Sequence, residues 1–174
     1  MLDLTQYIGS IPDFPKPGIL FRDITPLLAS PEALRETTRR IADHYRNAKI
    51  DKIAAVESRG FLFGTPLAME LNVGIIPVRK PGKLPGETVS YSYELEYGTD
   101  SLEIQKGAIQ PGERILVIDD LLATGGTVEA CCKLVEQVGG VVAGCAFVIE
   151  LSSLGGTQRL AHYHPMSLIS FEGD

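Results

Sequence analysis

The sequence predicts an α/β fold in which helices flank a twisted, mostly parallel sheet. Apolar stretches of strand length recur along the chain, over residues 50–56, 74–78, 114–118 and 141–149. Segments with the apolar spacing of helices alternate with them, over residues 31–47, 60–71 and 126–138. Strands that alternate with helices in this way form parallel sheets with helices on their faces.

The length and composition support one ordinary domain. The chain has 174 residues, of which 44% are hydrophobic and 22% charged. A chain of this length buries roughly 70% of its extended surface when it folds. We therefore expect a single domain over residues 1–174, with a core that needs no disulfide bonds.

The composition excludes several classes of protein. Because 22 acidic residues outnumber 16 basic ones, a nucleic acid is not an expected partner, since binding to its backbone depends on clustered Lys and Arg. The start, Met1-Leu2-Asp3-Leu4, lacks the positive charge of a secretory signal, and no apolar run approaches the ~18 residues that span a membrane. We expect a cytosolic protein without membrane contact. Cys131, Cys132 and Cys145 suggest no disulfide framework, so we expect small buried apolar residues; a reactive thiol is the less favoured alternative.

Each element of the first half follows from its own pattern. After a short N-terminal helical piece, residues 11–18 carry three prolines, so we expect an extended segment with few backbone hydrogen bonds to give a sheet. Ser30 before Pro31 and Glu32 is typical of a helix N-cap, and the apolar spacing after it predicts a helix that ends near Asn47. Residues 50–56 and 74–78 are then strands, with a helix over 60–71 between them.

The second half contains a hairpin before the strand and helix pattern resumes. Apolar side chains alternate from Val89 to Leu95 and again from Leu102 to Ile104, with a turn at Gly98, which predicts a long hairpin or mobile flap over 88–105. A strongly apolar strand follows at 114–118. The helix over 126–138 carries one apolar face and ends at Gly139-Gly140, before the strand at 141–149.

The most informative motif is Val117-Ile-Asp-Asp-Leu-Leu-Ala-Thr-Gly-Gly-Thr127, which passes from a buried strand through a glycine turn into a helix. In such sheets, ligands bind beyond the carboxyl ends of the strands. The residues of the turn place unpaired N–H groups and two hydroxyls at a helix N-terminus, which favours a phosphate site at Thr124, Gly125, Gly126 and Thr127. The motif contains neither of the common glycine-rich phosphate loops, G-x-x-x-x-G-K-[ST] and G-x-G-x-x-G.

Asp119 and Asp120 stand about one turn before this loop. A phosphate repels a pair of carboxylates, so they need another role, and binding the vicinal hydroxyls of a ribose fits their spacing. The structural alternative is that Asp120 caps the helix and the glycines only turn the chain.

Residues 117–127 resemble the phosphoribosyl-pyrophosphate signature of the type I phosphoribosyltransferases, and nearly the whole chain is similar to the adenine phosphoribosyltransferases. Four further blocks carry the resemblance, in the family's order: Phe14–Pro26, Glu57–Phe61, Arg79–Gly86 and Leu95–Gly98. The resemblance implies the type I phosphoribosyltransferase fold, with a small hood formed by about 1–30 and 150–174 and a flexible flap at about 81–105.

The resemblance also implies a role for each matching residue. The 5′-phosphate would lie on the loop formed by Ala123, Thr124, Gly125, Gly126 and Thr127, and the ribose hydroxyls on Asp119 and Asp120. Pyrophosphate would lie on a tight turn with a cis peptide, at Glu57, Ser58, Arg59 and Gly60, and on the basic residues Arg79, Lys80 and Lys83. The base adenine would contact Leu20, Phe21, Arg22 and Arg59, whereas Glu96 and Tyr97 of the flap, with Arg59, would be catalytic.

The reaction so implied joins adenine to phosphoribosyl pyrophosphate and yields AMP and pyrophosphate. Mg²⁺ would be carried by the pyrophosphate without direct protein ligands, and family members are homodimers. Two alternatives remain open: an enzyme for 6-oxopurines, many of which carry an aspartate where this chain has Ala123, and a non-enzymatic regulator that senses a purine or phosphoribosyl pyrophosphate. His162 and His164 lie near no third metal ligand in the sequence, so we expect structural histidines on a C-terminal strand.

Overall fold

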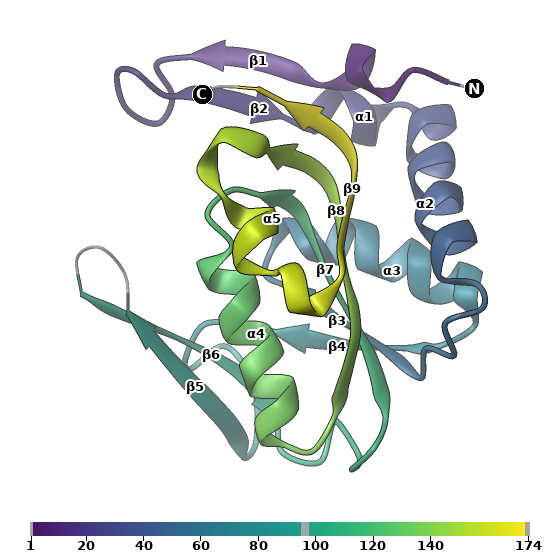
Figure 1. Cartoon of the computed structure of the whole chain (residues 1–174), viewed down its shortest axis with the longest axis vertical. Helices are drawn as coiled ribbons and strands as arrows, with labels where there is room; N and C mark the ends of the chain where they lie inside the picture. The colour runs from purple at the N-terminus through teal and green to yellow at the C-terminus, as the bar shows by residue number, and fades with distance from the viewer. Residues whose placement is uncertain (1, 95–97, 173–174) are drawn as a thin grey trace.

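The computed structural model describes residues 2–94 and 98–172, and its centre is a parallel five-stranded sheet (Figure 1). The strand order is β4-β3-β7-β8-β9, and all four pairings are parallel. The strands are β3 (Lys52–Val56), β4 (Gly74–Val78), β7 (Arg114–Leu122), β8 (Val141–Leu151) and β9 (Pro165–Phe171). The predicted parallel sheet is confirmed.

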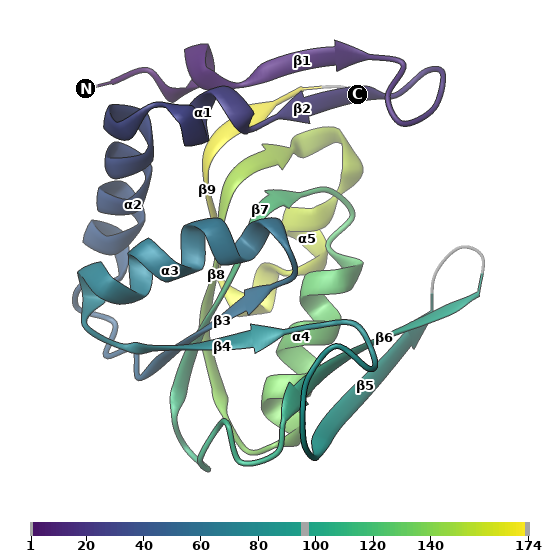
Figure 2. The same ribbon diagram turned by 180° about the vertical axis from the view of Figure 1, so that it is seen from behind.

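Helices cover both faces of this sheet. In Figure 1, α4 (Gly126–Gln137) lies in front of the sheet. Figure 2, the view from the opposite side, shows that α3 (Arg59–Leu71) covers the other face, with α2 (Pro31–Tyr45) beside α3. Strand side chains alternate between the two faces: Ile53 and Ala55 join the core under α2 and α3, whereas Ala54 and Val56 join the core under α4. The predicted N-cap of α2 is confirmed, since Ser30 Oγ accepts from the N–H of Ala33 at 3.2 Å.

The N-terminal segment forms a hairpin that the sequence did not predict. After a short 3-10 helix (Leu4–Tyr7), β1 (Gly9–Pro12) pairs antiparallel with β2 (Leu20–Asp23), and α1 (Thr25–Ala29) follows. The prediction of an extended segment outside any sheet is therefore wrong for residues 11 and 12. The chain reverses because Asp13 and Gly18 adopt left-handed backbone conformations and the N–H of Gly18 donates to Asp13 Oδ1 at 2.8 Å. The prolines fall in the loop or at the strand end, where no ladder donor is needed.

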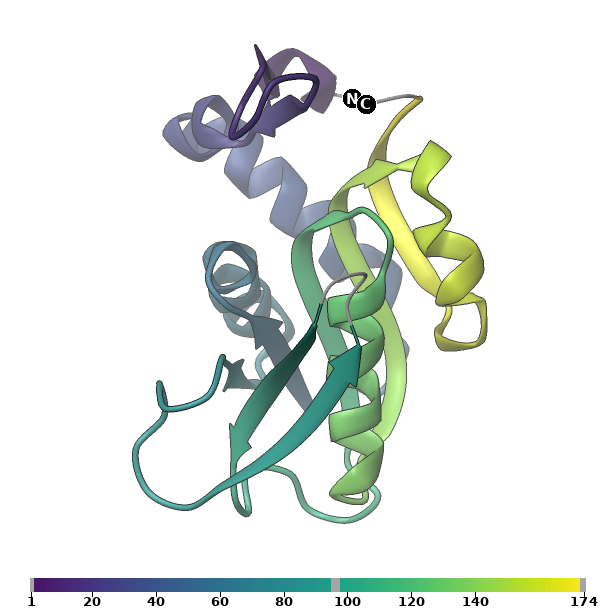
Figure 3. The same ribbon diagram turned by 90° about the vertical axis from the view of Figure 1, so that its left-hand side faces the viewer.

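The C-terminal segment completes the central sheet. Strand β8 extends to Leu151, and after α5 (Gly156–Arg159), flanked by two 3-10 turns (Ser152–Leu154 and Ala161–Tyr163), β9 forms the edge of the central sheet. Only the end of β9 reaches the β1–β2 hairpin, which lies across the top of the molecule in Figure 3. There the guanidinium of Arg22 stacks 4.0 Å from the centre of the Phe171 ring.

A second hairpin, β5 (Thr88–Glu94) with β6 (Thr99–Gln105), packs against α4. Its inward side chains, including Val89, Tyr91 and Tyr93, contact the core under α4, as the alternation predicts. A backbone bridge between Arg79 and Glu103 ties it to the end of β4. The predicted flap over about 81–105 thus comprises this hairpin and the loop before it.

Two smaller expectations have clear outcomes. Cys131, Cys132 and Cys145 are free thiols and fully buried, as expected, with Cys132 Sγ 3.5 Å from Cys145 Sγ. The two histidines are not on a strand: His162 lies in a 3-10 turn, and His164 has a left-handed backbone just before β9 begins. No helix in the described residues is long and apolar enough to span a membrane.

Candidate active site

A cavity of about 280 Å³ lies where the carboxyl ends of the central strands meet. The sheet reverses its strand order at this point, because β4 follows β3 on one side and β7 lies on the other, and such switch points are where open α/β sheets bind ligands. The cavity is lined by Val56, Glu57, Lys80, Asp119, Leu121, Leu122, Ala123, Thr124, Gly125, Gly126, Thr127 and Val128. The structure therefore brings together the whole predicted phosphate loop, one of the predicted acids and two residues predicted to hold pyrophosphate.

The phosphate loop is held in a fixed shape by its glycines and by the segment behind it. Gly125 has φ +81° and caps α4, a conformation that a side chain would strain. Gly156 packs so closely behind the loop that a Cβ there would lie 2.3 Å from the carbonyl oxygen of Ala123. The first N–H groups of α4 have no partners within the helix, so the loop offers them to an anion.

Asp119 and Asp120 lie within β7, which extends four residues further than predicted, and they point to opposite faces of it. Asp119 lines the cavity and keeps part of its surface open to it, and its Oδ1 accepts from the N–H of Asp120 at 2.8 Å. The alternative role of Asp120 as a helix cap is wrong, because Gly125 is the N-cap and no side chain bonds there.

Asp120 is almost fully buried beside Arg59. The Nε of Arg59 lies 3.0 Å from Asp120 Oδ2, but the contact is an ion pair without hydrogen-bond alignment, so Oδ2 has no hydrogen-bond donor among the described residues. Burial raises the pKa of Asp120, against the opposing effect of the Arg59 charge. Burial, together with the Asp120 carboxylate, raises the pKa of Asp119. Keeping both carboxylates charged is therefore unfavourable in this structure, and new hydrogen-bond donors would make it less so.

The predicted pyrophosphate turn joins β3 to α3. The peptide between Glu57 and Ser58 is cis, as the resemblance implied, and α3 begins at Arg59. A Cβ on Gly60 would lie 2.9 Å from the carbonyl oxygen of Ile118 and 3.3 Å from Asp119 Oδ1. Glycine at this position therefore lets the turn pack directly against the end of β7.

The three predicted basic residues have different surroundings. Arg79 does not line the cavity, because its Nε donates to the Glu57 carboxylate at 2.8 Å. Lys80 does line the cavity, and its ammonium pairs with Asp100 of β6. Lys83 is exposed and lies outside the cavity lining, although its carbonyl accepts from Arg79 at 3.4 Å.

The predicted adenine residues lie together on β2. In the described residues β2 pairs only with β1, so its other edge has backbone groups free for a flat ligand. The Phe21 ring lies 5.3 Å from the Arg59 guanidinium carbon, which links this strand to Asp120. The Arg22 side chain turns away, because it donates to Ser10 at 2.7 Å and stacks on Phe171.

Sequence reasoning missed three residues around the site. The exposed ring of Phe14 meets Phe21 edge to face at 5.1 Å, Asp100 pairs with Lys80, and Gly156 supports the phosphate loop. Phe14 belongs to one of the sequence blocks that carry the family resemblance, and only that resemblance points to it. The predicted catalytic residues Glu96 and Tyr97 lie outside the described residues.

Metal-binding residues are few in the described structure, where no three His, Cys, Asp or Glu side chains form a cluster that could hold an ion. The acids at the cavity are Asp119 and Glu57. One or two carboxylates beside substrate phosphates are the usual setting for Mg²⁺, so these residues fit an ion that arrives on pyrophosphate.

Known proteins resemble this chain along almost its full length. The model of the phosphoribosyl transferase domain matches residues 23–168. An adenine phosphoribosyltransferase of Clostridium beijerinckii is 57% identical over 171 residues, which are 98% of this chain and 99% of the relative.

Solved structures agree. The crystal structure of adenine phosphoribosyltransferase from Thermoanaerobacter pseudethanolicus has 55% identity and a TM-score of 0.93, and covers 97% of this chain and 98% of its own. The enzyme of Saccharomyces cerevisiae, solved with an imino-altritol bisphosphate and adenine, has 41% identity and a TM-score of 0.89 over 95% and 96% of the two chains. The chain therefore belongs to the phosphoribosyl transferase domain family and, within it, to the adenine phosphoribosyltransferases.

Proposed function

We propose that the protein transfers the 5-phosphoribosyl group from phosphoribosyl pyrophosphate to adenine and releases AMP and pyrophosphate. One observation carries this function: a single cavity joins an anion-binding helix N-terminus, Asp119 of the acid pair and Glu57 of the turn predicted to hold pyrophosphate. Next to this cavity, Arg59 lies between the Asp120 carboxylate and the Phe21 ring of β2. The family supports the same reaction, and the yeast relative was solved with adenine bound.

The phosphate loop and the acid pair would hold the ribose phosphate. The N–H groups and hydroxyls of Thr124–Thr127 would bind the 5′-phosphate at the positive end of α4. The ribose hydroxyls would donate to Asp119, which lines the cavity. A contact of the ribose with Asp120 stays a proposal, because this carboxylate is buried beside Arg59 and does not line the cavity.

Pyrophosphate would leave toward the turn at Glu57–Gly60 and the ammonium of Lys80. Bound Mg²⁺ would neutralise part of the charge on the leaving oxygens. Arg79 would act through Glu57, since its guanidinium is held there. A role of Lys83 in binding pyrophosphate stays a proposal, because Lys83 does not line the cavity.

Adenine would stack on Phe21 and bind its edge to the backbone of Leu20–Arg22. Nitrogen attack at the anomeric carbon breaks the bond to pyrophosphate and inverts that carbon, through a cation-like sugar that nearby anions stabilise. Glu96 would take part in removing the proton that adenine loses, and Tyr97 would help to exclude water.

The two alternatives are not favoured. A 6-oxopurine enzyme would often have an aspartate at position 123, where this chain has alanine. A regulator that only senses its ligand has no need of a pyrophosphate turn packed against Asp119.

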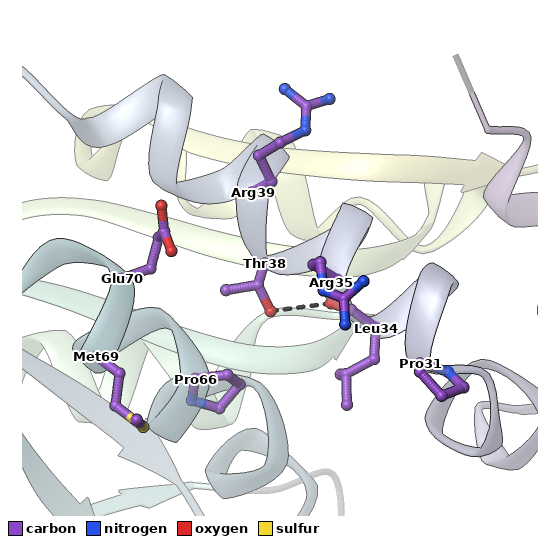
Figure 4. A pocket seen from close by; sticks show the side chains of 8 residues that line it. All are labelled: Pro31, Leu34, Arg35, Thr38, Arg39, Pro66, Met69 and Glu70. Carbon is purple, nitrogen blue, oxygen red and sulfur yellow. Dashed lines mark hydrogen bonds between the residues drawn. The ribbon is translucent and has the colours of Figure 1, made fainter.

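A homodimer is part of the proposal. A groove of about 730 Å³ lies between α2 and α3, lined by Pro31, Leu34, Arg35, Thr38, Arg39, Pro66, Met69 and Glu70 (Figure 4). Met69 on its rim is 78% exposed, which is unusual for a large apolar side chain. The groove carries the guanidinium groups of Arg35 and Arg39 and the carboxylate of Glu70. Opposite charges on one patch suit a two-fold interface, because the patch can then pair with its own copy.

Light scattering tests this interface. Met69→Glu should convert dimers to monomers, because it places a charge in an apolar contact. Val141→Glu, at an exposed valine of β8, is the matched control and should remain dimeric. A wild-type protein that is monomeric at micromolar concentration would contradict the dimer.

Chromatographic detection of AMP tests the function. Adenine and phosphoribosyl pyrophosphate with Mg²⁺ should yield AMP and pyrophosphate in equal amounts. Gly125→Val should lose this activity while remaining folded, because a valine side chain strains the left-handed backbone conformation that the phosphate loop needs at this position. Absence of AMP with folded wild-type protein would refute the proposal.

We also propose a cytosolic location, which cell fractionation tests.

A further inference from the structure

Two residues of the second hairpin, Tyr93 and Asp100, form a bridge between two residues that line the cavity, Thr127 and Lys80. The hydroxyl of Tyr93 lies 3.4 Å from Thr127 Oγ1 in the phosphate loop, and it donates to Asp100 Oδ2 at 3.3 Å. The same oxygen accepts from the ammonium of Lys80. A continuous chain of polar contacts therefore runs from the phosphate loop through the hairpin to the end of β4.

The hairpin presents these two residues as a unit. Tyr93 and Asp100 are direct partners in the antiparallel register of β5 and β6, so their side chains lie next to each other on one face. The Tyr93 ring packs against the core under α4, and Lys80 Nζ lies 6.0 Å from its centre. The ring is thus fixed by packing, and only its hydroxyl reaches the polar groups.

We propose that Tyr93, with Asp100, is a positioning residue that holds Thr127 and Lys80 in place for the two phosphate-bearing ends of phosphoribosyl pyrophosphate. This inference rests on the proposed function of the cavity. Lysine has a flexible four-carbon stem, so a fixed carboxylate beside its ammonium reduces the freedom that binding must remove. Tyr93 supports both ends at once, because its hydroxyl donates to Asp100 and can accept from Thr127.

Phenylalanine at position 93 would keep the packed ring and remove both contacts. Of the two, the contact with the Thr127 hydroxyl is the neutral one, and a neutral hydrogen bond changes binding by roughly three- to ten-fold. We therefore expect Tyr93→Phe to raise the KM for phosphoribosyl pyrophosphate about three- to ten-fold. The KM for adenine should stay within two-fold of wild type, because the proposed adenine contacts lie on β2 and the polar contacts of Tyr93 are to Asp100 and Thr127. We also expect little change in kcat.

Steady-state kinetics with both substrates varied tests the proposal. Tyr91→Phe is the matched control, because Tyr91 lies two residues earlier on the same face of β5 and its hydroxyl makes no hydrogen bond to the described residues. It should leave both KM values unchanged. An unchanged KM for phosphoribosyl pyrophosphate in Tyr93→Phe would overturn the proposal, as would an equal rise for adenine, which indicates general loosening.

A double-mutant cycle separates positioning from simple packing. If Tyr93 acts through Thr127, Tyr93→Phe should raise the KM for phosphoribosyl pyrophosphate much less in the Thr127→Val background than in the wild-type background. Fully additive effects would contradict the bridge. If the wild type made no AMP, the proposed function would fail instead, and calorimetry with AMP would test the bridge on its own: weaker binding to Tyr93→Phe supports it, and equal binding overturns it.

Discussion

Asp119 lines the cavity, and its buried charge lowers the stability of the folded protein. Its pKa is raised because protein surrounds it on most sides and because the Asp120 carboxylate lies beside it. Between the unfolded pKa and this raised folded pKa, the native state binds more protons than the unfolded state. Stability therefore falls as pH rises through that interval, and the penalty is fully present above the folded pKa.

Asp119→Asn should remove this penalty and weaken the site together. At pH 7 we expect a Tm above that of wild type, because the amide has no charge that burial disfavours. The kcat/KM for phosphoribosyl pyrophosphate should fall about ten-fold or more, because an amide cannot accept from ribose hydroxyls as a carboxylate does.

Calorimetric melts across pH check the cause. The stability advantage of Asp119→Asn should shrink as pH falls from the raised folded pKa of Asp119 toward its ordinary unfolded pKa, because the wild-type carboxyl is protonated in the native state over that interval. An advantage that does not depend on pH would assign the gain to packing rather than charge.

At the scale of elements, short-range signals predicted the site better than long-range ones. The phosphate loop could be predicted because strand, glycine turn and helix N-terminus are contiguous from 117 to 127. The pair of Lys80 and Asp100 could not, because twenty residues separate them and only the hairpin register brings them together. The hairpin of β1 and β2 was missed because its strands have four residues each and the prolines between them resemble those of an extended linker.

The segment after β8 also belongs to the site, through Gly156. A methyl group there would lie 2.3 Å from the Ala123 carbonyl and 2.7 Å from Leu122 Cδ1, so either α5 or the phosphate loop must move. We expect Gly156→Ala to destabilise the fold by about 1–3 kcal/mol and to raise the KM for phosphoribosyl pyrophosphate several-fold.

Denaturant unfolding and kinetics measure both effects. Gly74→Ala is the control, because a Cβ there would meet only Lys52 Cγ at 3.6 Å, an ordinary contact. Wild-type kinetics in Gly156→Ala would show that the loop does not depend on this packing.

At the scale of the whole molecule, the site draws on both cores. Phe21 comes from β2, and Arg59 is the first residue of α3, whereas Thr127 belongs to α4, against which the second hairpin packs. The carboxyl edge of the parallel sheet is where these groups meet. The sequence predicts this edge because alternating strands and helices indicate a parallel sheet, in which the carboxyl ends of all strands lie on one side. It does not predict that the Arg22 side chain turns to Ser10 and Phe171 rather than to a base.

Competition between purine bases tests the central claim most directly. Adenine has an exocyclic donor and an N1 acceptor, whereas hypoxanthine has a carbonyl and an N1 proton, so both hydrogen bonds to a fixed backbone edge on β2 would become repulsive. Sites that leave buried polar groups unpaired discriminate by about 10⁴ or more. Pyrophosphate release should therefore be faster with adenine by that factor in kcat/KM, and added hypoxanthine should scarcely slow it. Comparable kcat/KM values for the two bases would contradict the account.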